Sequence, residues 1–137
     1  SYWTPAEREY FAVFTSRLNE CPFCVRIHTE TTRVESAGAI DVKDSGSMRP
    51  EVAAMLPLLE KVTRTPDQAR GSDVDTVRAA GVPDEAIIDA LHVSLIFNIM
   101  NRLANAFDFR WDSEEDVRTS AKVIHRISYR LPPFLVR

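Results

Sequence analysis

The stretch PDEAIIDALHVSLIFNIMNRLANAF, residues 83–107, decides the fold class. It opens with Pro83, Asp84 and Glu85, a proline and two carboxylates, which are residues typical of a helix N-terminus. The residues that follow lack the strict polar–apolar alternation that marks a strand. The sequence therefore predicts a helix from Pro83 to about Phe107, the longest helix in the chain.

Helices are expected on both sides of this stretch from their start and stop signals. Thr4, Pro5 and Glu7 form the pattern of an N-cap, a first-position proline and a capping-box glutamate. Pro22 and Pro50 can each open another helix in the same way. The further expected helices cover residues 5–19, 22–36, 50 to near 66, 72–81, and 113 to just before 132.

The remaining segments complete an all-α prediction of about six helices. Residues 39–49 hold turn-forming residues with little periodicity, which predicts a loop. Pro57 lies inside an expected helix and predicts a kink or a break there. The length of 137 residues suits a single domain over residues 1–137. Because the sequence begins at Ser1 without an initiator methionine, a missing N-terminal segment is part of this expectation.

The composition excludes several classes of protein. Hydrophobic residues make up 45% and charged residues 27%, which is typical of a globular chain rather than a disordered one. The net charge of −3 argues against a nucleic-acid partner, and two cysteines exclude a disulfide-rich scaffold. The apolar run over residues 86–100 is interrupted by polar side chains and is shorter than the ~20 residues of a membrane span. With no secretory signal visible, we expect a cytoplasmic protein without a membrane partner.

Both cysteines lie in the segment CPFCVRIH, residues 21–28. On a helix, Cys21, Cys24 and His28 fall within an arc of about 60°. Cys21 comes at the first turn, where backbone N–H groups and the helix dipole stabilise a thiolate. His28 follows Cys24 by one turn and can take a thiol proton. This is the pattern of a redox dithiol with a base beside it.

Two other readings of the same residues stay open. Cys-x-x-Cys is also half of a zinc site, which His28 with His92 or His125 would have to complete. The two cysteines can also be buried and inert, with His28 a core residue. We favour the redox dithiol because the cap position, the shared helix face and the base agree.

Two further sets of polar residues deserve a structural explanation. Glu9 lies on a helix face with few other charges, so it is either a buried carboxylate with a partner or a solvated surface residue. Asn98, Asn101 and Asn105 recur at helical spacing, which predicts hydrogen bonds between helices rather than chemistry.

These residues together resemble a known family. A set of four residues, spaced by eleven, two and three positions, is similar to the signature of the alkylhydroperoxidase D-like family, the redox branch of the carboxymuconolactone decarboxylase superfamily: Glu9, Cys21, Cys24 and His28. Ser16 stands where family members usually carry a serine. The segment IFNIMNRLA, residues 96–104, resembles the Phe-Asn-x-x-Asn-Arg segment of the peroxidase-related subgroup.

The resemblance implies an all-α helical domain, assembled as trimers or hexamers, that reduces hydroperoxides with no metal, haem or other cofactor. It assigns Cys24 as the nucleophile and Cys21 as the resolving thiol, with Glu9 and His28 as a proton relay. An external dithiol, lipoyl or thioredoxin-like, would be the reductant. The helix dipole instead favours Cys21 as the more acidic thiol. Phe23 is a departure, because characterised family peroxidases carry a histidine at that position.

Two other functions remain as alternatives. The first is a carboxymuconolactone decarboxylase-type lyase, which would use a histidine and cationic residues, and the cysteine pair counts against it. The second is a non-catalytic helical protein that forms oligomers and retains the cysteines as remnants.

Overall fold

The computed structural model describes residues 1–127, which fold into six α-helices and two short 3₁₀ helices without a strand. The all-α prediction is confirmed. The elements are α1 (Pro5–Leu18), α2 (Pro22–Glu35), η1 (Ser45–Ser47), α3 (Pro50–Arg64), η2 (Pro66–Gln68), α4 (Gly71–Ala79), α5 (Asp84–Ala106) and α6 (Glu114–Ile127).

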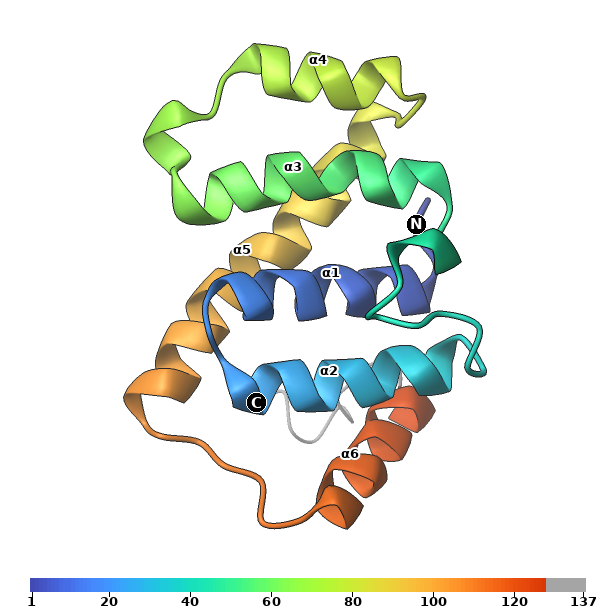
Figure 1. Cartoon of the computed structure of the whole chain (residues 1–137), viewed down its shortest axis with the longest axis vertical. Coiled ribbons are helices and arrows are strands. Elements are labelled where there is room, and N and C mark those ends of the chain that lie inside the picture. The colour runs from blue at the N-terminus through green and yellow to red at the C-terminus, as the bar shows by residue number, and fades with distance from the viewer. Residues whose placement is uncertain (128–137) are drawn as a thin grey trace, which may run out of the picture.

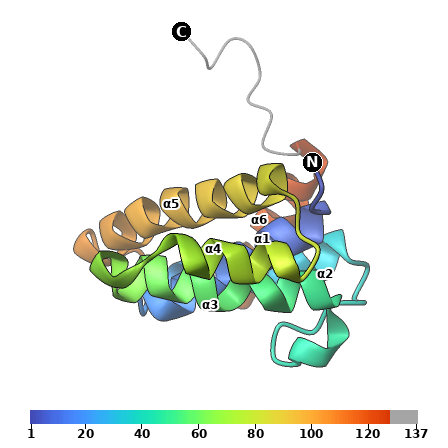
Figure 2. The ribbon, with the colours of Figure 1, turned by 90° about the horizontal axis from the view of Figure 1, so that it is seen from above.

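Helices α1 and α2 lie side by side as an antiparallel pair (Figure 1). Helix α3 packs on the other side of α1, and α4 packs on α3. Helix α5 crosses behind this layer and contacts all four of these helices, as the view from above shows (Figure 2). Helix α6 packs against α2. The seam between α1, α2 and α5 therefore lies inside the fold.

The starts of α1 and α2 follow from their sequences. The Thr4 hydroxyl accepts a hydrogen bond from the Glu7 backbone N–H at 3.2 Å, and the Glu7 carboxylate accepts one from the Thr4 N–H at 2.7 Å. This is the expected capping box, with Pro5 at the first helical position. The turn into α2 places Glu20 at φ 52°, in the left-handed region. Cys21 follows as the N-cap of α2.

The main core lies between α1, α3 and α5. Its largest fully buried side chains include Trp3, Phe11, Met55 and Leu59. Burying each such side chain stabilises the fold by about 2 kcal/mol. The Trp3 indole N–H donates to the Ala86 carbonyl at 2.7 Å and joins the N-terminal segment to α5. This core holds α1 and α5 in fixed register, which positions the residues of the seam.

The structure corrects details of the sequence prediction. Helix α3 continues through Pro57, so the predicted break is wrong. Pro57 and the preceding Ala53 both face solvent, where water can bond the Ala53 carbonyl that loses its N–H partner. The short helices η1 and η2 lie in segments that were expected to be irregular. The predicted end of the last helix, before residue 132, lies outside the described residues.

Helix α5 also corrects the expectation about membrane spans. By length and composition alone it is apolar enough to cross a membrane. The core helix of a soluble protein passes the same test, and α5 packs on α1 and α3 through one face. Its opposite face is apolar and exposed, from Ile88 to Phe107.

Candidate functional site

A buried carboxylate–imidazole pair joins the middle of α1 to α2. The His28 Nδ1 atom lies 2.7 Å from Glu9 Oε2, and the two residues are 7% and 5% exposed. When the Glu9 carboxylate is ionised it can only accept, and in that state the Nδ1 N–H of His28 donates this bond. In the neutral ring this leaves Nε2 with a lone pair, so the pair has the arrangement of a general base held in one tautomer.

Helix α5 covers this pair with an aromatic side chain. The Phe97 ring meets the His28 imidazole edge to face, with the ring centroids 4.5 Å apart and the planes at 80°. Phe97 therefore fixes the plane of the imidazole from the side opposite α2. Both residues of the Glu9–His28 pair are almost fully buried, and low exposure to water strengthens the hydrogen bond.

The two cysteines lie together at the N-terminal end of α2. Both are free thiols, with Cys21 at 0% and Cys24 at 6% exposure, and they share a small apolar cluster with Ala104. Their side chains are hydrogen-bonded to each other. Cys24 lies one turn before His28 on α2, so the thiols and the relay occupy the same helix face.

Burial raises the pKa of the Cys24 thiol to about 12, and its hydrogen bond with Cys21 acts in the same direction. A bond with Asn101 lowers the pKa but does not offset burial. The thiol is therefore neutral in the resting structure at neutral pH. The stabilisation by the helix N-terminus that the sequence predicted concerns Cys21, which is the N-cap of α2.

Asn101 is the polar residue on α5 that meets the thiols. It is fully buried, its amide donates to the Ser16 hydroxyl at 2.9 Å, and its oxygen accepts from Asn19 at 3.1 Å. Since it also interacts with Cys24, it ties the sulfur to α1 and α5. The predicted interhelical hydrogen bonds of the asparagines are confirmed, because Asn98 and Asn105 also bond to Asn19.

The zinc reading finds no support in the geometry. Across residues 1–127, no three or more His, Cys, Asp or Glu side chains are grouped as metal ligands. His92 is exposed on α5, and His125 pairs with Glu35 at 3.0 Å instead of approaching His28. Neither of the two histidines that the sequence offered as further ligands belongs to such a group within residues 1–127.

Comparison with known proteins relies on solved structures. No protein-family model and no curated protein matches the sequence. A peroxidase-related protein from Silicibacter sp. TM1040, described as uncharacterized, is 26% identical, with a TM-score of 0.71. A protein from Ralstonia eutropha JMP134, described as an alkylhydroperoxidase AhpD core and an uncharacterized peroxidase-related protein, is 27% identical, with a TM-score of 0.75.

The chain is therefore similar in fold and in sequence to peroxidase-related proteins of the alkylhydroperoxidase D type. Each match covers 83% of this chain and 63% of the other protein, so the chain spans less than two thirds of their length. The predicted resemblance to alkylhydroperoxidase D-like proteins is confirmed by these structural matches.

Aromatic packing surrounds Phe23, which stands where the resemblance predicts a histidine. The Phe23 ring stacks on Trp111 with centroids 4.5 Å apart, and it meets Phe109 edge to face at 5.6 Å. The Trp111 indole N–H donates to the Phe23 carbonyl at 2.9 Å. The loop between α5 and α6 therefore packs on Phe23 and bonds to its carbonyl, which holds the backbone between the two cysteines in place.

Sequence reasoning missed two residues of the site. It treated Asn101 as a structural residue and did not single out Phe97 as a partner of His28. The available signal was their four-residue spacing, which places both on one face of α5. That spacing does not reveal which helix the face meets, and only the fold brings it against Cys24 and His28.

Proposed function

We propose that this alkylhydroperoxidase D-like protein is a thiol peroxidase that reduces hydroperoxides through Cys21 and Cys24. The observation that carries the proposal is the buried Glu9–His28 pair, one helical turn from a buried pair of thiols. A carboxylate and an imidazole inside a fold are costly to desolvate, so a stability role alone explains them poorly.

The proposed first step activates and oxidises Cys24. His28, oriented by Glu9, takes the thiol proton through Nε2, and the thiolate attacks the terminal peroxide oxygen. The oxygen–oxygen bond breaks, Cys24 becomes a sulfenic acid, and the proton passes from His28 to the leaving oxygen, which departs as an alcohol or as water. The Asn101 amide would stabilise the developing thiolate, since its interaction favours the charged form of Cys24.

The second and third steps restore the enzyme. The Cys21 thiol attacks the sulfenic sulfur of Cys24, a disulfide forms and water leaves. An external dithiol then supplies two electrons and two protons, by thiol–disulfide exchange, and becomes a disulfide itself. We assign the attack on peroxide to Cys24 because it lies nearer His28 along α2 and because Cys21 is fully buried.

Self-association is part of the proposal. Seven apolar residues form the α5 apolar stripe, and each is between 45% and 69% exposed: Ile88, Leu95, Ile96, Ile99, Met100, Leu103 and Phe107. A contiguous exposed apolar patch of this kind marks an interaction site on a protein surface. A second copy of the chain is the proposed cover, in a homo-oligomer located in the cytoplasm.

Mass spectrometry of the intact protein tests the proposal. After one equivalent of hydroperoxide, the wild type should lose two hydrogens within one chain, and addition of a dithiol should restore the mass. Cys21→Ser should instead gain one oxygen, because its sulfenic acid has no resolving thiol. Unchanged masses in both proteins would exclude the peroxidase.

A non-catalytic role is the second candidate, and the raised pKa of Cys24 favours it. A buried thiol with a pKa of about 12 and no working base is inert toward electrophiles. Treatment with peroxide separates the two candidates, because a thiol that the relay deprotonates is oxidised at neutral pH and a thiol without a base is not. A protein that keeps both thiols after prolonged exposure to peroxide would be the non-catalytic one.

A further inference from the structure

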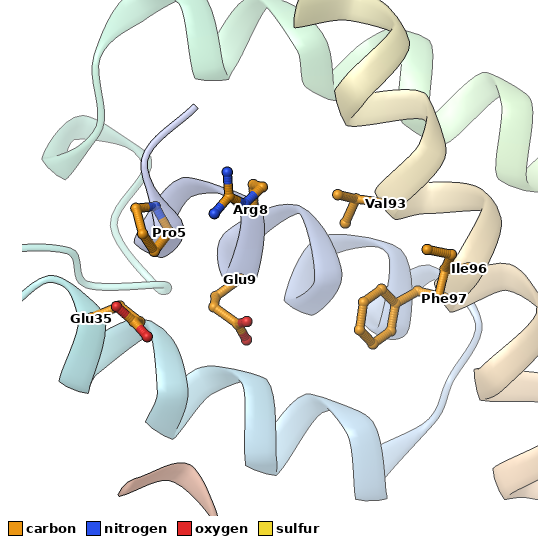
Figure 3. Close-up of a pocket in the computed structure, with 7 residues that line it drawn as sticks. All are labelled: Pro5, Arg8, Glu9, Glu35, Val93, Ile96 and Phe97. Carbon is orange, nitrogen blue, oxygen red and sulfur yellow. The ribbon is translucent and has the colours of Figure 1, made fainter. Parts of the chain in front are cut away.

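A cavity lies directly against the proposed relay. It is a pocket of about 360 Å³ between the start of α1, the middle of α5 and the end of α2 (Figure 3). This volume is at the lower end of the range for small-molecule sites. Its apolar wall consists of Pro5, Val93, Ile96 and Phe97. We call this cavity the α1–α5 pocket.

The pocket and the relay share two residues. Glu9 lines the pocket, and its carboxylate points from α1 toward α2, where it meets His28 (Figure 3). Phe97 lines the pocket and contacts the His28 ring. Cys24 lies one turn before His28 on α2, which is about 6 Å along the helix axis. A molecule in the pocket therefore lies on the same seam as the thiols.

The pocket is lined by two carboxylates that have histidine partners and by an arginine that pairs with no carboxylate among residues 1–127. Each carboxylate there has an imidazole partner, since Glu9 pairs with His28 and Glu35 pairs with His125 at 3.0 Å. The Arg8 guanidinium donates to the Trp3 carbonyl at 3.3 Å, and no carboxylate among residues 1–127 forms an ion pair with it. Arg8 is thus the cation of the pocket without an anionic partner.

We propose that the α1–α5 pocket binds a hydroperoxide with a free carboxylate on an acyl chain, such as an oxidised fatty acid. Its carboxylate pairs with Arg8, its chain lies on Val93, Ile96 and Phe97, and its peroxide group points along the seam toward Cys24. The inference rests on the proposed function, for which it names the substrate class. The reaction breaks the oxygen–oxygen bond, oxidises Cys24 to the sulfenic acid and releases the hydroxy acid.

The pocket favours a carboxylate over a phosphate as the anionic group. A carboxylate carries one negative charge and fits a guanidinium in a bidentate arrangement. A phosphate carries more charge, so Glu9 and Glu35 in the same pocket would repel it more strongly than they would repel a carboxylate. The apolar wall in turn selects a chain over a compact hydrophilic peroxide.

The binding experiment uses decanoate, an unreactive acid, with calorimetry and methyl-group NMR of the wild-type protein. Decanoate should bind and should shift the methyl resonances of Val93 and Ile96. Arg8→Gln should weaken its affinity about tenfold, the effect expected for one charge-assisted hydrogen bond. Arg17→Gln is the matched control, because Arg17 is also on α1 and donates to a backbone carbonyl, and it should bind decanoate as the wild type does.

A kinetic experiment links the pocket to the reaction. The ratio of kcat/KM for a carboxylated alkyl hydroperoxide to that for cumene hydroperoxide should fall about tenfold in Arg8→Gln. An unchanged ratio, or decanoate shifts that avoid Val93 and Ile96, would overturn the pocket assignment even with peroxidase activity intact. Binding of decanoate with no reduction of any peroxide would contradict the proposed function and leave the pocket assignment in place.

Discussion

Replacing Glu9 with glutamine tests whether its charge activates the thiol through His28. The bond from His28 Nδ1 to Glu9 is 2.7 Å long and joins two residues that are both less than a tenth exposed. A hydrogen bond to an ionised group contributes about 1.5–3 kcal/mol. Glutamine keeps the shape and a neutral acceptor but cannot stabilise the imidazolium that forms when His28 takes the proton. We expect the rate of Cys24 oxidation to fall about 30-fold, which corresponds to about 2 kcal/mol.

The assay measures sulfenic acid formation at Cys24 after rapid mixing with hydroperoxide, in the Cys21→Ser background, where the product accumulates. Glu30→Gln is the control, since it removes a carboxylate of α2 that pairs with Arg33, and its rate should match that of the parent. Glu9→Asp keeps the charge with a shorter side chain and should recover part of the rate. If Glu9→Gln keeps the parent rate while Glu9→Asp lowers it, the electrostatic argument is refuted and Glu9 is a packing residue.

Three further substitutions test the thiol environment, the fold and the assembly. Because the pKa of Cys24 is about 12, its alkylation rate should rise about tenfold per pH unit above neutrality, and Asn101→Leu should shift this profile to higher pH by removing the bond that lowers the pKa. Burial raises the pKa of Glu7, but its bonds with Arg49 and the Thr4 cap lower it further, so the carboxylate stabilises the fold above its unfolded pKa of about 4.5. Urea unfolding should show Glu7→Gln about 2 kcal/mol less stable at neutral pH, and the difference should vanish as the pH falls through the lowered pKa. Leu95→Glu, on the α5 apolar stripe, should dissociate the oligomer in analytical ultracentrifugation, and a wild type that already sediments as a monomer would contradict the interface.

Helix starts were predictable because they depend on local chemistry. Thr4 and Glu7 satisfy backbone N–H groups within one turn, so a four-residue pattern is sufficient to place α1. Pro57 misled for the same reason, because a local rule predicts a break. Burial of Met55, Leu58 and Leu59 on the core side outweighs the missing hydrogen bond, and that burial depends on other helices.

The faces of α5 were not predictable from its sequence. Apolar side chains lie on both sides of the helix, so its periodicity does not distinguish the side that packs on α1 from the side that remains exposed. The α1–α5 pocket and the α5 apolar stripe both depend on that choice. Neither was part of the sequence prediction.

The residues of the site were predictable as a set, but their contacts were not. The spacing of Glu9, Cys21, Cys24 and His28 indicated the resemblance to alkylhydroperoxidase D-like proteins, and a buried Glu9 was expected to have a partner. Its contact with His28 requires α1 and α2 to pack side by side in antiparallel register. Asn101 follows Cys24 by 77 positions in the sequence, so no local pattern joins them.

The central claim is that the Glu9–His28 relay activates a thiol that burial alone would make inert. The most direct measurement is the second-order rate constant for oxidation of Cys24 by a hydroperoxide, beside that of free cysteine at the same neutral pH. A pKa of about 12 alone would make Cys24 roughly a thousandfold slower than free cysteine, because so little thiolate is present. With the relay working, Cys24 should react at least about a hundredfold faster than free cysteine. A rate equal to or below that of free cysteine would contradict the claim.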